Sequence, residues 1–214
     1  MSNIGEPKVT WFDDFLGIRI NPIYAISLAG TGDVKISDGP NGVLALYATS
    51  AATGTARVRL GEEPGNSLHN ALNFSARKNL VYQARVFLNR NTDIQATVGL
   101  TGLNDPHNVL ALVYDHPHTQ EGWFFQGINE GANLTIPIGF KHDPGAYFTV
   151  RIEADPDIAK VFINGEVEPR AVIGHEFIPD GLCAEFQVWN RPLGGGLYSQ
   201  PTLYADYLSI VQDR

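Results

Sequence analysis

The sequence predicts an all-β protein, an antiparallel jelly-roll-like β-sandwich formed as a single domain over residues 1–214. Short apolar runs alternate with a period of two residues, and no segment of helical length repeats every 3.6 residues. The 22 glycines and 13 prolines are spread along the chain, as many turns between short strands require. No linker, repeat or shift in composition divides the chain, so one domain is expected.

Residues 147–165 show this pattern most clearly. Apolar side chains alternate with polar ones over Val150–Ala154, so one face of the strand is buried and the other is wet. Asp155–Asp157, with a central proline, favours a turn. A second alternating run, Val161–Ile163, ends at Asn164–Gly165, a pair that suits a tight hairpin. We therefore expect two linked hairpins in an antiparallel sheet.

The rest of the chain supplies the other strands, about twelve to fourteen in all at the spacing typical of a sandwich. In the run 55–60, Val58 and Leu60 are expected to point inward, with Arg57 and Arg59 outward. The other strands are expected at residues 9–16, 23–28, 34–37, 43–49, 80–88, 93–101, 109–114, 123–128, 132–136, 182–189 and 203–211.

Composition excludes several partners. The net charge of -8 and the lack of a basic run argue against nucleic acid, whose phosphates attract cations, and against an anionic membrane surface. A strongly anionic polysaccharide is disfavoured for the same reason unless a local groove is basic. Cys183 is the only cysteine, which rules out an intrachain disulfide, and no secretory signal or apolar membrane span is recognised. The chain is expected to fold in a cytosol.

The hairpin sequence FTVRIEAD followed by KVFING resembles the central hairpins of the concanavalin A-like and laminin G-like β-sandwich superfamily. The resemblance implies that the first and last strands lie side by side. Lectins, glycan hydrolases, polysaccharide lyases, adhesion domains and virion proteins share this fold, so the fold alone does not select a function.

Four pieces in order, WFDDFLG, VGLTG, the two hairpins and DYLSIVQDR, resemble a family of tailed-phage virion proteins. This resemblance implies a non-catalytic capsid decoration or tail-associated module, assembled in the host cytoplasm and incorporated into the virion. Its expected partners are a repeating lattice of capsid or tail proteins, a second copy of itself, and a host glycan. A carbohydrate-binding lectin-like domain is the alternative, and a polysaccharide lyase or glycoside hydrolase is the third.

Two enzyme patterns were compared with the chain. Family 16-type glucanases carry E-x-D-x-x-E on one strand, whereas here Glu153 and Asp155 are followed by the apolar Ile158. Alginate-lyase-like sandwiches carry Gln-x-His, whereas here Gln187 is followed by Trp189. Because both patterns are incomplete, no catalytic residue and no enzymatic activity are expected.

The remaining candidates are a surface and a loop. Trp189, Asn190, Arg191 and Tyr198, beside a triple glycine, form the expected ligand or partner surface. Cys183 has no adjacent histidine and is not expected to act as a nucleophile. A second group, close together in sequence but without tight ligand spacing, is interpreted as exposed loop residues, so no metal or cofactor is expected; it comprises Asp105, His107, Asp115, His116 and His118.

Overall fold

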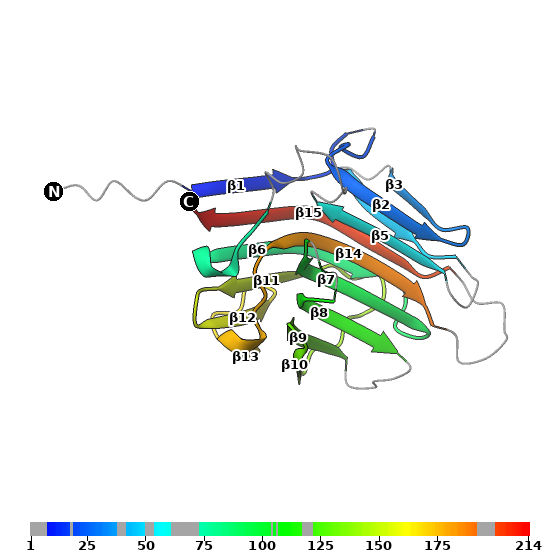
Figure 1. Cartoon of the computed structure of the whole chain (residues 1–214). Helices are drawn as coiled ribbons and strands as arrows, with labels where there is room; N and C mark the ends of the chain where they lie inside the picture. The colour runs from blue at the N-terminus through cyan, green and yellow to red at the C-terminus, as the bar shows by residue number, and fades with distance from the viewer. Residues whose placement is uncertain are drawn as a thin grey trace.

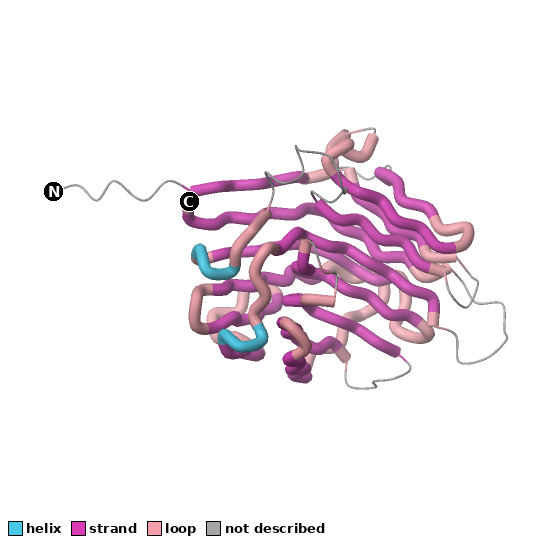
Figure 2. The backbone as a smooth tube through the Cα atoms, viewed as in Figure 1, coloured by secondary structure: helices cyan, strands magenta, loops and turns pink. Residues whose placement is uncertain are grey.

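The computed structural model describes residues 8–17, 19–37, 42–49, 54–60, 73–103, 105, 107–116, 122–191 and 200–214. The described chain forms two antiparallel sheets that stack face to face (Figure 1). Figure 2 shows that strands and their turns make up almost all of the described backbone. The expectation of an all-β antiparallel sandwich is therefore confirmed.

One sheet has eight strands, in the order β13-β12-β11-β6-β15-β4-β3, with β1 pairing to β15. The expected hairpin joins β11 to β12, where Val150 lies opposite Ile163, and it lies beside the edge strand β13 rather than in the middle of the sheet. The strands of this sheet are β1 (Lys8–Asp13), β3 (Asp33–Ser37), β4 (Val43–Tyr47), β6 (Leu80–Leu88), β11 (Phe148–Ala154), β12 (Ile158–Ile163), β13 (Ala171–Gly174) and β15 (Thr202–Asp213).

The other sheet has seven strands, in the order β10-β9-β8-β7-β14-β5-β2. Its two longest strands, β7 and β14, lie side by side, with Phe186 opposite Val98. The strands of this sheet are β2 (Tyr24–Ala29), β5 (Thr55–Leu60), β7 (Ile94–Gly102), β8 (Val109–His116), β9 (Trp123–Asn129), β10 (Ala132–Pro137) and β14 (Leu182–Asn190).

The two ends of the described chain meet in one strand pair. β1 runs antiparallel to β15, with Trp11 opposite Ile210 (Figure 1). This confirms the side-by-side placement that the superfamily resemblance implied. The structure adds one strand that the sequence did not indicate, the short edge strand β13. The helical segments of the described chain are single turns, η2 (Ala76–Lys78) and η3 (His175–Phe177), and none is long or apolar enough to cross a membrane.

The core fills the space between the two sheets. Each strand contributes alternate side chains to it, so β6 buries Tyr82 and Val86 while β14 buries Phe186 and Val188. Trp123 of β9 is fully buried in this core. Burying an aromatic side chain removes about 150–250 Å² from water, so these rings supply much of the hydrophobic stabilisation.

The outer face of the seven-stranded sheet carries the side chains that alternate with these core residues. On β14 the residues between the core positions are Cys183, Glu185, Gln187 and Trp189. The same alternation places Gln95, Thr97 and Thr101 of β7 on this face, together with Arg57 and Arg59 of β5. A charged and amide-rich surface therefore crosses three adjacent strands, and it contains the candidate site.

Candidate functional site

A groove of about 300 Å³ lies on the outer face of the seven-stranded sheet. We call it the outer groove. It crosses β5, β14, β7, β8 and β9, and it is lined by Arg57, Gln95, Thr97, Thr101, His107, Val109, Val113, Gln126, Glu185, Gln187 and Trp189. Its volume is at the lower end of the range of about 300–1,000 Å³ that is usual for small-molecule sites.

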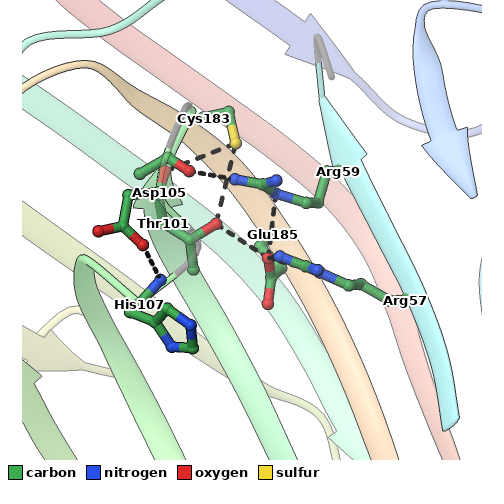
Figure 3. Close-up of polar contacts among 8 residues, drawn as sticks. Arg57, Arg59, Thr101, Asp105, His107, Cys183 and Glu185 are labelled. Atoms are coloured by element: carbon green, nitrogen blue, oxygen red, sulfur yellow. Dashed lines mark hydrogen bonds and ion pairs between the residues drawn. The ribbon is translucent and has the colours of Figure 1, made fainter. Parts of the chain in front are cut away.

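Glu185 is at the centre of a charged cluster in the floor of the groove. Its Oε2 atom accepts hydrogen bonds from Arg57 Nε at 2.9 Å, Arg57 Nη2 at 2.6 Å and Thr101 Oγ1 at 2.8 Å. Arg59 Nε lies 3.2 Å from the same oxygen. Figure 3 shows the two arginines approaching the carboxylate from β5. Because the Glu185 side chain is only 3% exposed, these donors replace the water that the carboxylate has lost.

The cluster also holds the end of β7 in place. Arg59 donates from Nη2 to the carbonyl oxygen of Gly102, and Cys183 Sγ donates to the Thr101 carbonyl at 3.5 Å. Desolvation by burial lowers the pKa of Arg59 from its usual value, while the nearby Glu185 carboxylate opposes that effect. Burial raises the pKa of the Cys183 thiol, so the cysteine stays protonated and unreactive at neutral pH.

His107 is presented to the groove by the connection after β7. The Asp105 carboxylate accepts a hydrogen bond from the backbone N–H of His107 at 2.9 Å, and Asn108 N–H donates to the Asp105 carbonyl at 3.0 Å (Figure 3). Gly102 N–H then donates to the Asn108 carbonyl at 2.7 Å. The turn thus fixes the backbone of His107 while its imidazole stays exposed.

Trp189 forms one end of the groove. With its amide oriented to satisfy both neighbours, Gln187 accepts from Trp189 Nε1 at 3.1 Å and donates to Glu185 Oε1 at 3.3 Å. The Arg191 guanidinium lies 5.1 Å from the centre of the Trp189 ring. These contacts hold the half-buried indole in one orientation, and an aromatic face in a polar groove is suited to stacking against a sugar ring.

The structure separates the four residues of the expected ligand surface. Trp189 lines the outer groove and Arg191 packs beside it. Asn190 is only 1% exposed, because alternation turns it toward the interior, and its Oδ1 accepts from Arg90 Nη2 at 2.8 Å. Its side chain is therefore not part of that surface. Tyr198 and the triple glycine lie outside the described residues.

The described loop residues that were considered as metal ligands are not gathered into one site. His116 Nδ1 accepts from the Asp93 backbone N–H at 3.0 Å, and Asp105 is used in its own turn. In the described part of the chain, no three His, Cys, Asp or Glu side chains are placed to share a metal ion. His118 lies outside the described residues.

The acids first compared with a glucanase pattern lie on the wrong sheet for this groove. Glu153 is on the outer face of the eight-stranded sheet, where its Oε1 is 3.3 Å from Arg151 Nε. Asp155 accepts hydrogen bonds from the backbone N–H groups of Asp157 and Ile158, both at 2.9 Å, and so forms the turn. Both acids are therefore engaged in contacts within their own hairpin.

Sequence reasoning missed most of the site, including Glu185, Gln95 and Thr101. A signal was present, because the polar residues Glu185 and Gln187 alternate with apolar ones on β14. Arg57 and Arg59 were correctly placed on an outward face, and His107 was considered only as a metal ligand. What the sequence lacked was the strand order that brings β5, β14 and β7 together.

Comparisons with known proteins identify the fold. No family model and no curated protein matches the chain. Among solved structures, a β-glucanase of Bacillus licheniformis superposes with a TM-score of 0.62 at 13% identity, covering 99% of this chain and 100% of that one.

Two further enzymes give similar values. A family 16 glycosyl hydrolase of Mycobacterium smegmatis has a TM-score of 0.65 at 13% identity, covering 94% of this chain and 98% of that one. A β-1,3-1,4-glucanase (lichenase) from a mouse hindgut metagenome has a TM-score of 0.65 at 14% identity, covering 95% and 98%. These matches show that the chain has the concanavalin A-like jelly-roll fold of such enzymes.

The matches correct two expectations drawn from the sequence. A non-catalytic virion module was expected, with no enzymatic activity, yet the three proteins named above, which share the fold along nearly the whole chain, are described as glycan hydrolases. The expectation was wrong because it looked for catalytic acids on β11, across the sandwich from the outer groove. It also relied on a resemblance of short sequence pieces to phage proteins, and none of the structures named above is a phage protein. The lectin-like alternative is weaker than an enzyme because those structures are described as glycan hydrolases.

Proposed function

We propose that the protein is a glycan-degrading enzyme whose substrate lies in the outer groove. The observation that supports this most directly is the outer groove itself, which is open, crosses five strands, is lined mainly by polar residues and has Trp189 held at one end. The structural neighbours named above include enzymes described as acting on β-glucans, and they have the same sandwich. A glycan is therefore the substrate class with the strongest support.

The groove limits the chemistry. Glycosidases that use two carboxyl groups place them about 5–5.5 Å or 6.5–9.5 Å apart. Among the described residues that line the groove, Glu185 is the one carboxylate. Its Oε2 receives three hydrogen bonds from Arg57 and Thr101, so Glu185 would have to lose several contacts before it could transfer a proton.

His107 is the better candidate for proton transfer. Its imidazole lines the same groove and is exposed, and its backbone is fixed by the Asp105 turn. A positioned histidine can donate or accept a proton at neutral pH, and general acid–base catalysis of this kind contributes about 10²–10⁴-fold to rate. In this proposal Trp189 binds the saccharide and Glu185 positions the arginines. His107 donates a proton to the bound saccharide or accepts one from it.

A depolymerisation assay tests the proposal. The full chain is incubated with mixed-linkage β-glucan, β-1,3-glucan, polygalacturonate and alginate, and new reducing ends and unsaturated products are measured. Release of oligosaccharides from at least one polymer is expected. A Trp189→Ala variant should lose most of that activity at low substrate concentration. No product from any polymer, with no measurable binding, would refute the proposal.

A further inference from the structure

The side chains around the groove present an excess of hydrogen-bond donors. Arg191 donates from Nε at 2.9 Å and from Nη2 at 2.5 Å to the same Oε1 atom of Gln95. Because both bonds go to the oxygen, the orientation of the Gln95 amide is fixed. Its NH₂ group is left to donate to a molecule in the groove.

Arg57 also presents an available hydrogen-bond donor to the groove. Its Nε and Nη2 atoms both donate to Glu185 Oε2, and its Nη1 atom has no hydrogen-bond partner among the described residues. The Arg57 side chain is 22% exposed and lines the groove. A guanidinium presents its donors in a rigid fork, so Nη1 is available to a ligand while the other two nitrogens hold the side chain still.

The acceptors of the groove are largely occupied. Glu185 Oε2 is shared by Arg57, Arg59 and Thr101, and Oε1 accepts from Gln187. The Gln187 oxygen in turn accepts from Trp189. Gln126 donates from Nε2 to Thr135 at 3.2 Å, which leaves its amide oxygen for a sugar hydroxyl. A neutral glycan needs acceptors for its hydroxyl protons, and Glu185 and Gln187, the acidic and amide acceptors of β14, already have donors.

We propose that the substrate is an acidic glycan, with the carboxylate of a uronic acid residue bound by Arg57 Nη1 and Gln95 Nε2. This inference rests on the proposed function and adds the substrate class to it. A carboxylate is an acceptor only, so it matches the free donors, and charge-assisted bonds to arginine are about twice as strong as neutral ones. The arginines concentrate positive charge here although the whole chain carries -8, so the groove attracts an anion that the rest of the surface repels.

Binding measurements on the full chain test this assignment. Calorimetric titration compares hexuronate oligosaccharides with neutral gluco-oligosaccharides and with sulfated oligosaccharides of equal length. We expect the hexuronate to bind at least tenfold more tightly than the neutral sugar. Arg57→Gln should remove that tenfold preference and leave neutral binding within about twofold, and Arg57→Lys should give an intermediate value because it keeps the charge without the fork.

Two further variants control the experiment. Arg191→Gln frees the Gln95 amide without touching Glu185, so it should reduce the hexuronate preference even if Arg57→Gln proves unstable. Arg85 pairs with Asp206 at 2.6 Å on the outer face of the other sheet, and Arg85→Gln should leave binding unchanged.

The outcomes separate this inference from the proposed function. Equal affinity for acidic and neutral sugars, or equal weakening of both by Arg57→Gln, would overturn the acidic-glycan assignment. Tighter binding of the sulfated sugar would overturn the assignment to a carboxylate. In each of these cases cleavage of any glycan would still support the proposed function. Only failure to bind or cleave every glycan would refute both.

Discussion

Arg57 on β5 and Glu185 on β14 form a diagonal pair across adjacent strands, with Nη2 and Oε2 2.6 Å apart. The residue directly opposite Glu185 is Arg59, and the residue directly opposite Arg57 is Gln187. The carboxylate thus connects two successive outward positions of β5. Because Thr101 of β7 joins the same oxygen, one carboxylate ties three strands of the groove floor together.

Replacing Glu185 with glutamine should destabilise the fold. A neutral amide leaves two guanidinium groups without their shared carboxylate in a nearly dry site, and breaking a buried ion pair in this way costs about 3–5 kcal/mol. We expect the urea concentration at the unfolding midpoint to fall, while the m-value, the dependence of the unfolding free energy on urea concentration, stays unchanged. Circular dichroism measures both.

Glu153→Gln is the matched control. Glu153 pairs with Arg151 in the other sheet, but both side chains are more than a third exposed, at 38% and 34%. An exposed pair contributes about 0–1 kcal/mol, so the two variants should differ clearly in stability. Equal loss of stability in the two variants would show that the Glu185 cluster contributes no more to the free energy of unfolding than an exposed ion pair does.

Replacing Trp189 should weaken saccharide binding more than folding. Its ring is half-buried at the end of the groove and stacks against Arg191 on one side. Loss of an aromatic contact of about 0.5–1.5 kcal/mol predicts a rise of about three- to tenfold in the dissociation constant for Trp189→Ala. Trp189→Phe keeps a stacking ring and should restore most of the affinity, whereas unchanged binding by the alanine variant would place the saccharide elsewhere.

Replacing His107 should lower turnover without lowering affinity. Its imidazole is exposed in the groove, so His107→Ala is expected to fold normally and bind glycan as the parent does. The rate should fall by about 10²–10⁴-fold if this side chain transfers the proton. Initial rates at saturating polymer measure the effect. His116→Ala is a control from the same sheet, and an active His107→Ala enzyme would exclude the assigned role.

The strand pattern could be predicted because alternation is a local property. The runs around Val150 and Val161 were readable from neighbouring residues alone, and the structure pairs them as expected. β13 was missed because Ala171, Val172 and Ile173 are all apolar, so its buried and exposed positions do not differ in polarity. Its pairing with β12 is determined by tertiary contacts instead.

The groove could be predicted only in part. Outward positions such as Arg57 and Gln187 follow from alternation, but their meeting depends on which strands are neighbours. β5 and β14 are separated by 121 residues between Leu60 and Leu182 and still pair directly. The burial of Asn190 next to the half-exposed Trp189 also follows from the two-residue period, which a grouping by sequence proximity overlooks.

His142 provides a pH-dependent test of the folded structure. It is 5% exposed, its Nδ1 accepts from Trp123 Nε1 at 3.1 Å, and its Nε2 therefore carries the hydrogen that points to the Arg90 carbonyl at 3.2 Å. A second proton on Nδ1 would face the indole N–H. Desolvation by burial lowers the pKa of His142 below its usual 6.5, although the Arg90 carbonyl and Asp143 oppose this.

The sign of the effect on stability follows from proton uptake. Above the unfolded-state pKa, about 6.5, both states are neutral at His142 and this group adds no pH dependence. As the pH falls below about 6.5 the unfolded chain binds a proton that the folded chain does not, so stability decreases until the lowered folded pKa is reached. The slope from this group is at most about 1.4 kcal/mol per pH unit. Urea unfolding from pH 8 to pH 4.5 measures it, and His142→Gln, which keeps a donor and an acceptor, should remove that component. A variant with the parent's full slope below pH 6.5 would show that other groups cause the acid sensitivity.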